Sequence, residues 1–429
     1  MILPERLFEH NRSKLNKALA KNSVAIIHSN DEMPRNGDQF FPFRQNSDLF
    51  YLTGIDQALT ILILCPNHPM ANRREILFIE KPNQLTETWY GKRLTKSEAT
   101  EISGIKNILW IEDFDRMFDE MVYVSEDIYL NQYENPRFVT DVKSREARFT
   151  QKVQKNYPLH RLARLAPLMT SLRLAKEPEE IKIIYHACEI TGKAFDRVLK
   201  TLKPGMHEFE VEAELSYEFR RHGATGHAFH PIVASGENAC ILHYVNNRNV
   251  CKDGDLLLLD FGAEFSNYAS DCSRTIPVNG RFTKRQKQLY QSVLNVFNKT
   301  REMMIKGTSI TIINKQVGKL WEEEHVNLGL YSMEDLHRQD PENPLYTQYF
   351  MHGISHFMGL DVHDVGNRLE TFESGMVVTC EPGIYVREEG IGIRIENDIL
   401  ITEEAPIDLM KHIPMEIEEI EDLMNAGKK

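Results

Sequence analysis

The sequence predicts two domains, an α/β domain at the N-terminus and a larger α+β domain built from two similar halves. Three observations lead to this prediction. At 429 residues the chain is too long for one ordinary hydrophobic core. Its first 150 residues alternate short apolar runs with charged helical stretches. Beyond them, a pair of helix patterns followed by β-rich sequence occurs twice, about a hundred residues apart.

In the first domain, apolar runs predict the strands and lysine- and glutamate-rich stretches predict the helices. We expect strands at residues 24–28, 49–54, 59–65, 75–80 and 107–111, and helices at 95–103 and 112–121. This alternation is typical of an α/β fold with a mixed or parallel sheet. The stretch contains no phosphate-binding glycine loop, which argues against a nucleotide-binding role.

A basic, helical stretch at residues 144–175 separates the two domains. Pro158 and Pro167 interrupt it, as expected of a connecting helix and linker. A new helix then begins near Pro178, with acidic residues beside it. We therefore place the N-terminal domain, with its linker helix, at residues 1–172 and the second domain at residues 173–429.

The second domain repeats one plan, which predicts pseudo-twofold halves. Helices are expected at 179–203 and 208–222, and again at 284–306 and 310–328. The segments after the first pair carry two candidate acids, and those after the second pair carry further acids and histidines. A site formed by both groups would lie where the halves meet, a common place for a pocket.

Asp260 and Asp271 belong to a predicted hairpin over residues 253–278. The apolar strand ends at Asp260, the chain turns near residues 266–267, and it returns through Asp271. Either aspartate alone could be a solvated residue at a strand end. Four leucines directly before Asp260 argue against that alternative.

Two glutamates occupy comparable positions in the second half. Glu381 follows the apolar run VVTC and precedes Pro-Gly, so its strand should end there. Residues 391–401 alternate apolar and polar side chains, which predicts a half-buried strand with Arg394 and Glu396 on one face. Arg394 could orient a metal-binding Glu396, or the two could form an ordinary surface ion pair.

Three histidines lie in HGISHFMGLDVHD, residues 352–364: His352, His356 and His363. Two histidines four apart suggest a helical zinc site, but Gly353 and Gly359 disfavour a helix and no HExxH glutamate is present. His243, in ACILHY, is a fourth candidate whose alternative is a core histidine at a strand end.

Ionised carboxylates rarely lie in apolar surroundings unless they are paired or bind a cation. Two divalent ions would neutralise four of them. We therefore interpret one set of residues as a dinuclear metal site: Asp260, Asp271, His356, Glu381 and Glu396.

The ordered motifs D-x10-D, HGxSHxxGLDVHD, EPGIY and GIRIEND resemble the metallopeptidases of the pita-bread fold. That family includes aminopeptidase P, prolidase and methionine aminopeptidase, and the resemblance covers the whole second domain. The segment at residues 35–55, RNGDQFFPFRQNSDLFYLTGI, is similar to the opening of aminopeptidase P. The resemblance thus implies an α/β N-terminal domain followed by a creatinase/aminopeptidase-like, pita-bread catalytic domain.

In that family the five matching residues bind two metal ions, which hold a bridging hydroxide that attacks the scissile carbonyl. The oxygen-rich ligand set favours Mn²⁺ over zinc, with Co²⁺ and Fe²⁺ as further alternatives. By resemblance Glu381 shuttles the proton, while His363 and His243 contact the scissile peptide. The remaining candidates are expected on the substrate side: His352 beside the proline, with Tyr385 and Arg394 near the substrate.

The N-terminal resemblance favours an Xaa-Pro aminopeptidase acting on peptides with proline second. A prolidase, which cleaves Xaa-Pro dipeptides, would share the metal site. A non-catalytic pita-bread binding module and a metal-free creatinase-like hydrolase are disfavoured because all five ligand positions are filled. One departure is that the stretch from His363 to Glu381 is shorter than in several aminopeptidase P sequences. The arginine expected there could correspond only to Arg368.

Composition bounds the partners and the compartment. The net charge of −12 argues against nucleic-acid or anionic-membrane partners, and no apolar run approaches a membrane span of roughly 18 residues. The N-terminus meets charged residues too early for a signal peptide. Six scattered cysteines without a CxxC pair indicate reduced thiols in the cytoplasm. We expect a homodimer or homotetramer, with Trp89 of TWYGKRL as a candidate subunit contact by resemblance.

Overall fold

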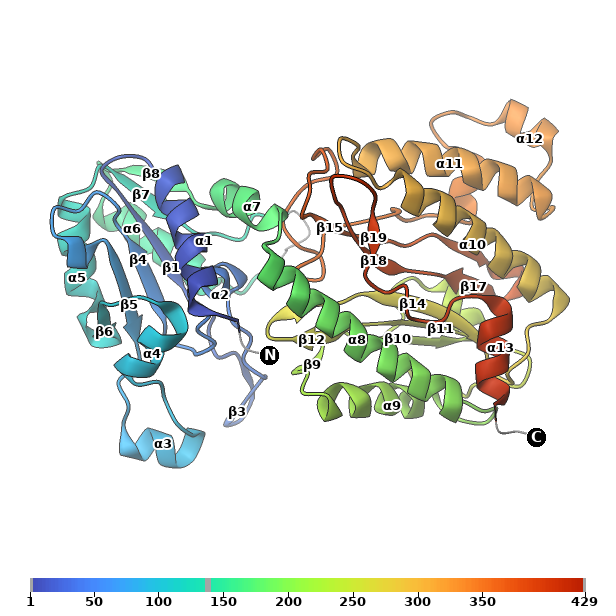
Figure 1. The fold of residues 1–429 in the computed structure, drawn as a ribbon, viewed down its shortest axis with the longest axis horizontal. Coiled ribbons are helices and arrows are strands. Elements are labelled where there is room, and N and C mark those ends of the chain that lie inside the picture. The colour runs from blue at the N-terminus through green and yellow to red at the C-terminus, as the bar shows by residue number, and fades with distance from the viewer. Residues whose placement is uncertain (1–2, 136–139, 427–429) are drawn as a thin grey trace. The chain divides into compact units, whose positions relative to one another are not determined.

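The computed structural model describes residues 3–135 and 140–426 of the chain. It divides into two compact units, Met1–Arg173 and Leu174–Lys429. Each unit has its own sheets and covering helices, and Figure 1 labels both sets.

The first unit contains a six-stranded sheet in the order β6-β5-β4-β1-β7-β8. β1 is parallel to β7 and antiparallel to β4, so the sheet is mixed, as the sequence predicted. The strands are β1 (Ser23–His28), β4 (Ile61–Leu64), β5 (Glu75–Ile79), β6 (Ile108–Trp110), β7 (Asp127–Leu130) and β8 (Arg161–Arg164). A small hairpin, β2 (Pro34–Asn36) and β3 (Gln39–Phe40), stands apart from the sheet.

Helices α5 and α6 supply the apolar cover of one sheet face. Phe114, Phe118 and Met121 of α5 and Phe149 and Val153 of α6 pack with strand residues in one buried core. The helices of this unit are α1 (Glu5–Ala18), α2 (Ser47–Thr53), α3 (Gln84–Tyr90), α4 (Lys96–Ser103), α5 (Phe114–Tyr123), α6 (Arg145–Asn156) and α7 (Ala166–Leu174).

Two local features of this region differ from the sequence prediction. Residues 49–54 form helix α2 rather than a strand, because caps at both ends override the strand preference of its aromatic residues. The Asn46 side chain accepts hydrogen bonds from Asp48 N and Leu49 N, and Gly54 closes the helix at φ +67°. The basic stretch 144–175 is interrupted near Pro158, as expected, but the interruption contains strand β8, which pairs with β7 and was not expected.

In the second unit the first half consists of two helices and a three-stranded antiparallel sheet. The helices are α8 (Pro178–Thr201) and α9 (Glu208–Arg221), and the sheet order is β10-β11-β14. Its strands are β10 (Ile232–Ser235), β11 (Leu256–Phe261) and β14 (Cys272–Pro277). The short strands β9 (Gly226–His227), β12 (Ala263–Phe265) and β13 (Tyr268–Ala269) form a second sheet beside them. The chain turns at Ser266 and Asn267, both with positive φ, where the sequence placed the hairpin turn.

The second half repeats this arrangement. Helices α10 (Lys284–Met303) and α11 (Ile310–Asn327) precede a three-stranded sheet in the order β15-β18-β19. In Figure 1, α8 and α9 lie on one side of the strands of this unit, and α10 and α11 lie on the other. The remaining elements are α12 (Met333–Arg338), β15 (Val377–Cys380), β16 (Gly383–Val386), β17 (Ile391–Arg394), β18 (Asn397–Leu400), β19 (Ile407–Asp408) and α13 (Ile417–Asn425).

The segment at residues 391–401 differs from the half-buried strand that its alternation predicted. It divides into β17, which pairs with β16, and β18, which pairs with β15 and β19. Both faces of the segment are buried, because the polar residues point into the interior of the unit. Alternation therefore identified the extended backbone but not its surroundings.

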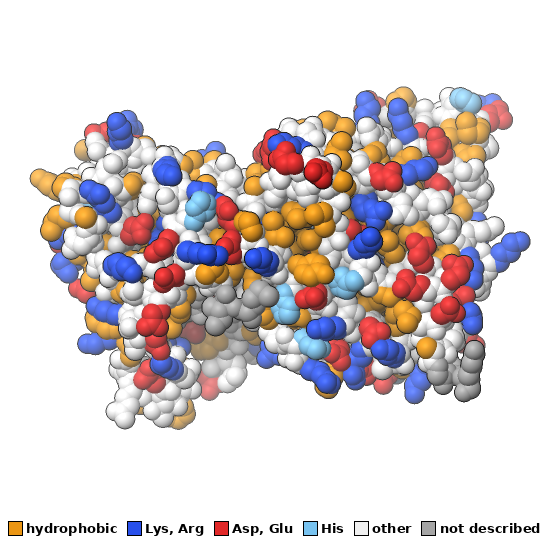
Figure 2. Space-filling view, viewed as in Figure 1, with side chains coloured by type: hydrophobic (Ala, Val, Ile, Leu, Met, Phe, Trp, Pro, Cys, Tyr) orange, Lys and Arg blue, Asp and Glu red, His pale blue; other side chains and the backbone are white. Residues whose placement is uncertain are grey.

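The structure shows how the cysteines and the charged side chains are distributed. All six cysteines are buried and free. On the face shown in Figure 2, acidic and basic side chains are interspersed. Among residues 3–135 and 140–426, none of the helices combines the length and apolarity needed to cross a membrane.

His325 of α11 makes the stability of the second unit depend on pH. The ring is 0% exposed and stacks on Trp321, and burial lowers its pKa to about 3. The unfolded chain, with an ordinary histidine pKa, binds the proton more readily, so stability is lost as pH falls below about 6.5. Relative to pH 7, this group should cost about 2 kcal/mol of unfolding free energy at pH 5.

We predict that His325→Phe removes that part of the pH dependence, measured by chemical denaturation at pH 5 and pH 7. The matched control is His337→Phe, at an exposed position on α12, which should leave the dependence unchanged. An equal loss of stability at pH 5 in wild type and His325→Phe would contradict the assignment.

Candidate metal centre

The first-half hairpin brings two aspartates to the same end of paired strands. Asp260 lies near the end of β11 opposite Ser273 of β14, and Asp271 directly precedes β14. Between these two aspartates, the backbone of Gly262 packs against the backbone of Ser270. A Cβ on Gly262 would lie 1.7 Å from the carbonyl oxygen of Ser270. Only glycine fits this approach, so Gly262 helps to set the spacing of the two carboxylates.

The second half contributes two glutamates, and one of them is tied directly to the first half. Glu381 follows β15, as predicted, and Glu396 lies between β17 and β18. Glu396 N donates to Ser273 O at 3.1 Å, and Ser273 Oγ donates to Glu396 Oε2 at 2.7 Å. This bridge joins β14 to the second half at the candidate site.

His356 is held in an orientation that leaves one ring nitrogen free. Its backbone N donates to Thr379 Oγ1 at 3.1 Å, and Nδ1 lies 3.1 Å from the carbonyl of Phe357. Because a carbonyl only accepts, neutral His356 carries its proton on Nδ1 and its lone pair on Nε2. That atom lies 3.4 Å from Asp271 Oδ2 and 3.9 Å from Glu381 Oε1.

Three of the five residues predicted as ligands converge in one cluster. Ligand atoms of Asp271, His356 and Glu396 all lie within 4.8 Å of one another. The other two lie beside it: Glu381 approaches His356, and Asp260 Oδ2 accepts a hydrogen bond from Arg394 Nη2 at 2.6 Å.

The buried carboxyl groups of the cluster need positive charge nearby in order to be ionised. Burial raises the pKa of Asp271 and of Glu396 well above the ordinary values, and the neighbouring carboxylates raise both further. Burial also raises the pKa of Glu381, and it raises that of Asp398, which accepts from Asp271 N, to about 7. Within this group, the guanidinium of Arg394 donates to the carboxylate of Asp260.

Unsatisfied oxygens show that a cation would fit. Asp260 Oδ1 and Asp271 Oδ1 are buried and have no hydrogen-bond partner. Buried polar atoms normally have partners, and an unpartnered carboxylate oxygen is a ready ligand for a divalent ion. The donor set, four carboxylates and one imidazole nitrogen, suits hard or borderline divalent metals.

Arg394 is 4% exposed and its hydrogen bonds are made inside the protein. It donates to Asp260, to Ser273 Oγ at 2.8 Å and to Tyr385 OH at 2.7 Å. Its distance to Glu396 Oε2 is 4.0 Å, so its closer carboxylate partner is Asp260 rather than the expected Glu396. The surface ion pair considered from the sequence is absent at this buried position.

A directional hydrogen-bond chain continues from Arg394 to His352. The Nδ1 of His352 lies 2.8 Å from Gly353 O and must donate to it, so Nε2 accepts from Tyr385 OH at 2.8 Å. Burial lowers the pKa of His352 to about 3, with smaller contributions from Arg394 and His243. His352 is therefore a neutral ring with both nitrogens engaged.

The two remaining histidines are exposed and lie near this group. The His363 ring meets the His356 ring edge to face, with centroids 4.5 Å apart. The next residue, Asp364, forms a buried ion pair with Lys176 at 3.2 Å. His243 lies close enough to His352 to influence its pKa.

Arg368 also lies beside the histidine segment. A Cβ on Gly353 would lie 3.1 Å from Arg368 Nη2, which places the guanidinium next to the residue that follows His352.

Sequence reasoning missed two polar residues that organise the cluster, Ser273 and Asp398. Each lies two residues beyond a predicted ligand, Asp271 and Glu396 respectively. In an extended backbone, residues two apart lie on the same face, so this spacing could have identified Ser273 and Asp398.

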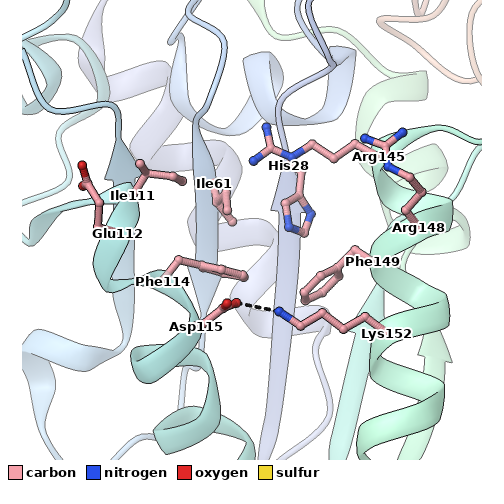
Figure 3. A pocket seen from close by; sticks show the side chains of 10 residues that line it. All are labelled: His28, Ile61, Ile111, Glu112, Phe114, Asp115, Arg145, Arg148, Phe149 and Lys152. Atoms are coloured by element: carbon pink, nitrogen blue, oxygen red, sulfur yellow. Dashed lines mark hydrogen bonds and ion pairs between the residues drawn. The ribbon is translucent and has the colours of Figure 1, made fainter.

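A separate pocket of about 450 Å³ lies wholly within the first unit. Figure 3 shows Arg145, Arg148 and Lys152 of α6 on one side of the pocket, and Asp115 of α5 and Glu112, just before α5, on the other. Two of its three α6 cations are in ion pairs, since Arg148 binds Asp31 at 2.8 Å and Lys152 binds Asp115 at 2.8 Å, and the third, Arg145, donates to Ser29 Oγ at 3.0 Å. It contains none of the predicted site residues.

Comparison with known proteins matches both parts of the chain. Residues 182–403 match the model of metallopeptidase family M24, and residues 8–129 match the N-terminal domain of aminopeptidase P. The Xaa-Pro aminopeptidase of Escherichia coli K12 is 36% identical, with 98% of each chain covered. The human Xaa-Pro aminopeptidase 3 is 30% identical over 94% of this chain and 81% of its own length.

Solved structures give the same result. Zinc-substituted E. coli aminopeptidase P in complex with product superposes with a TM-score of 0.88 at 34% identity, with full coverage of both chains. The E. coli enzyme with the inhibitor Pro-Leu gives 0.89 at the same identity and coverage. The expected pita-bread fold is thereby confirmed, and the chain belongs to metallopeptidase family M24, within its aminopeptidase P group.

Proposed function

We propose that this chain is a metal-dependent aminopeptidase that removes the N-terminal residue from peptides with proline in second position. The observation that carries the proposal is the buried cluster of Asp271, His356 and Glu396, in which Asp271 Oδ2 lies 3.4 Å from His356 Nε2 and Asp271 Oδ1 has no hydrogen-bond partner. Membership of the aminopeptidase P group supplies the reaction class. The N-terminal match favours this activity over the dipeptide-restricted prolidase, which remains the alternative.

The proposed ligands of two divalent cations are Asp260, Asp271, His356, Glu381 and Glu396. Mn²⁺ suits this oxygen-rich set best, and Co²⁺, Fe²⁺ and Zn²⁺ are the alternatives. When bound, such ions supply Lewis acidity toward a carbonyl oxygen and lower the pKa of water.

The surrounding side chains orient the substrate and move protons. Glu381, beside His356, is placed to accept the proton of the attacking water and return it to the leaving nitrogen. His243 and His363, both exposed near the cluster, would donate hydrogen bonds to the scissile peptide as charge develops. His352 presents its ring as a wall for proline, because its nitrogens are engaged.

Arg394 has a positioning role in this proposal. We expected it on the substrate side, but its hydrogen bonds instead hold Asp260 and Tyr385. Through Tyr385 it also fixes the ring of His352. Arg368, near Gly353, is the better candidate for contact with the substrate.

Assembly and compartment are parts of the same proposal. Helix α3 buries none of its residues, and Leu85, Trp89 and Tyr90 are each at least 70% exposed. Exposed apolar patches often mark contacts between proteins. We propose that this α3 patch contacts another subunit in a homodimer or homotetramer. The free, buried cysteines support a reducing compartment such as the cytoplasm.

Substrate length and the second residue test the activity. With Mn²⁺ added, the protein should cleave Xaa-Pro-Yaa faster than the dipeptide Xaa-Pro, and should cleave Xaa-Ala-Yaa at least about tenfold more slowly, since pocket fit discriminates by that order. Product release followed by chromatography measures all three rates. Turnover confined to the dipeptide would establish the prolidase alternative instead.

Metal binding tests the ligand assignment. Asp271→Asn and His356→Ala should each lower the bound Mn²⁺ per chain and reduce activity by more than about 100-fold, because the first removes a negative charge and one oxygen and the second removes the imidazole nitrogen. Elemental analysis and circular dichroism give metal content and fold. The control is His337→Ala, at an exposed histidine outside the site. Variants that keep activity within tenfold of wild type would count strongly against the assignment.

The α3 patch gives a test of assembly. Trp89→Ala should shift light-scattering mass toward the monomer, because it removes a large exposed anchor without touching a core. Tyr123→Ala, a highly exposed aromatic on α5, serves as the control. A wild-type protein that is monomeric at all concentrations would contradict the proposal.

A further inference from the structure

A second buried carboxylate in the catalytic unit binds donors instead of a cation. Glu208, the first residue of α9, is 0% exposed. Its Oε1 accepts from Ser235 N at 2.8 Å, Ser235 Oγ at 2.7 Å and Asn238 Nδ2 at 3.1 Å. Its Oε2 accepts from Tyr244 OH at 2.8 Å and Asn249 N at 2.8 Å. Five donors thus converge on one side chain.

Every one of these donors belongs to a single segment, residues 235–249, which leaves β10 through a 3-10 helix, η3 (Gly236–Cys240). A buried carboxylate is stable when its charge is fully hydrogen-bonded, and such charge-assisted bonds are strong. The segment is held at its beginning, middle and end by one group. Glu208 N also donates to Asn249 O at 2.9 Å, so Asn249 is bound to both the backbone and the side chain of Glu208.

The helix itself does not need this side chain. The first turn of α9 is capped by His207 and Glu210, whose side chains bond reciprocally to the backbone. Glu208 therefore serves the segment 235–249 rather than the helix end.

His243 lies within the segment, directly before one of the anchored residues. Tyr244 is 9% exposed and turns its hydroxyl to Glu208, while His243 is exposed. His243 also lies near His352 of the candidate site. Anchoring of Tyr244 thereby constrains the backbone from which the His243 side chain extends.

We propose that Glu208 is a positioning residue for peptide hydrolysis, which holds the 235–249 segment so that His243 faces the substrate. The inference rests on the proposed function, because it takes His243 as a group that contacts the scissile peptide. Glu208 acts only through the segment, and none of its described hydrogen bonds involves a predicted metal ligand.

A double-mutant cycle tests the coupling. Glu208→Gln keeps the shape of the side chain but replaces one carboxylate oxygen with an NH2 group. That group is a hydrogen-bond donor, and it would face the donors that the oxygen now accepts from. It should lower kcat by about 10- to 100-fold, the range expected when a catalytic group is misplaced by about 1 Å. KM and bound metal should change little. In the His243→Ala background, the same substitution should lower kcat by less than about twofold, because the group it positions is already missing.

Two further variants complete the design. Glu210→Gln, an exposed neighbour on α9 that can still cap the helix, should behave as wild type. Tyr244→Phe removes a single donor and should lower kcat several-fold, again only when His243 is present. If Glu208→Gln fails to fold, Tyr244→Phe tests the positioning role in its place. Hydrogen exchange of residues 235–249 reports the loss of anchoring independently of activity.

The outcomes separate the two hypotheses. If His243→Ala alone leaves kcat unchanged, the role of His243 in the proposed function fails and the inference falls with it. If His243→Ala lowers kcat but Glu208→Gln or Tyr244→Phe lowers it by the same factor in both backgrounds, only the positioning role is overturned. The same conclusion holds if neither variant changes kcat or hydrogen exchange.

Discussion

The structure of the catalytic unit depends on one electrostatic constraint, the burial of several carboxylates beside the guanidinium of Arg394. Burial alone raises the pKa of Asp271 and Glu396 well above normal, and each neighbouring acid adds to the effect. Arg394 compensates for only part of this charge through its bond to Asp260. Such a cluster is retained in a fold when a cation completes it, because unpaired buried charge is otherwise strongly destabilising.

Neither half of the unit can form this cluster alone. The first half supplies the two aspartates from one hairpin, and the second half supplies the histidine and two glutamates. The Ser273–Glu396 bridge joins the halves at the backbone and through the side chains. Arg394 extends the connection, since it belongs to the second half and donates to Asp260 and Ser273 of the first. Packing of the halves and assembly of the site are therefore one event.

Much of this could be predicted from the sequence because strand ends are local features. The apolar runs before Asp260 and Glu381 identified both strands and placed both acids correctly at their ends. The helix at residues 47–53 was missed because two caps outweighed its strand-like composition. The partner of Arg394 was missed for another reason: alternation places Arg394 and Glu396 on one face, but tertiary packing brings Asp260, distant in sequence, closer.

Glu208 and Asp271 show how a carboxylate that binds hydrogen-bond donors differs from one that binds a metal. Both are buried, and neither forms a salt bridge with a lysine or arginine among the described pairs. Glu208 has five donors on its two oxygens, whereas Asp271 leaves Oδ1 without a partner and places Oδ2 against the free nitrogen of His356. The first arrangement is complete within the protein, so a cation there would have to displace existing bonds. The second is incomplete, and a divalent ion is what its remaining oxygens and the imidazole lone pair can share. Counting satisfied oxygens thus separates the two roles where burial and charge alone do not.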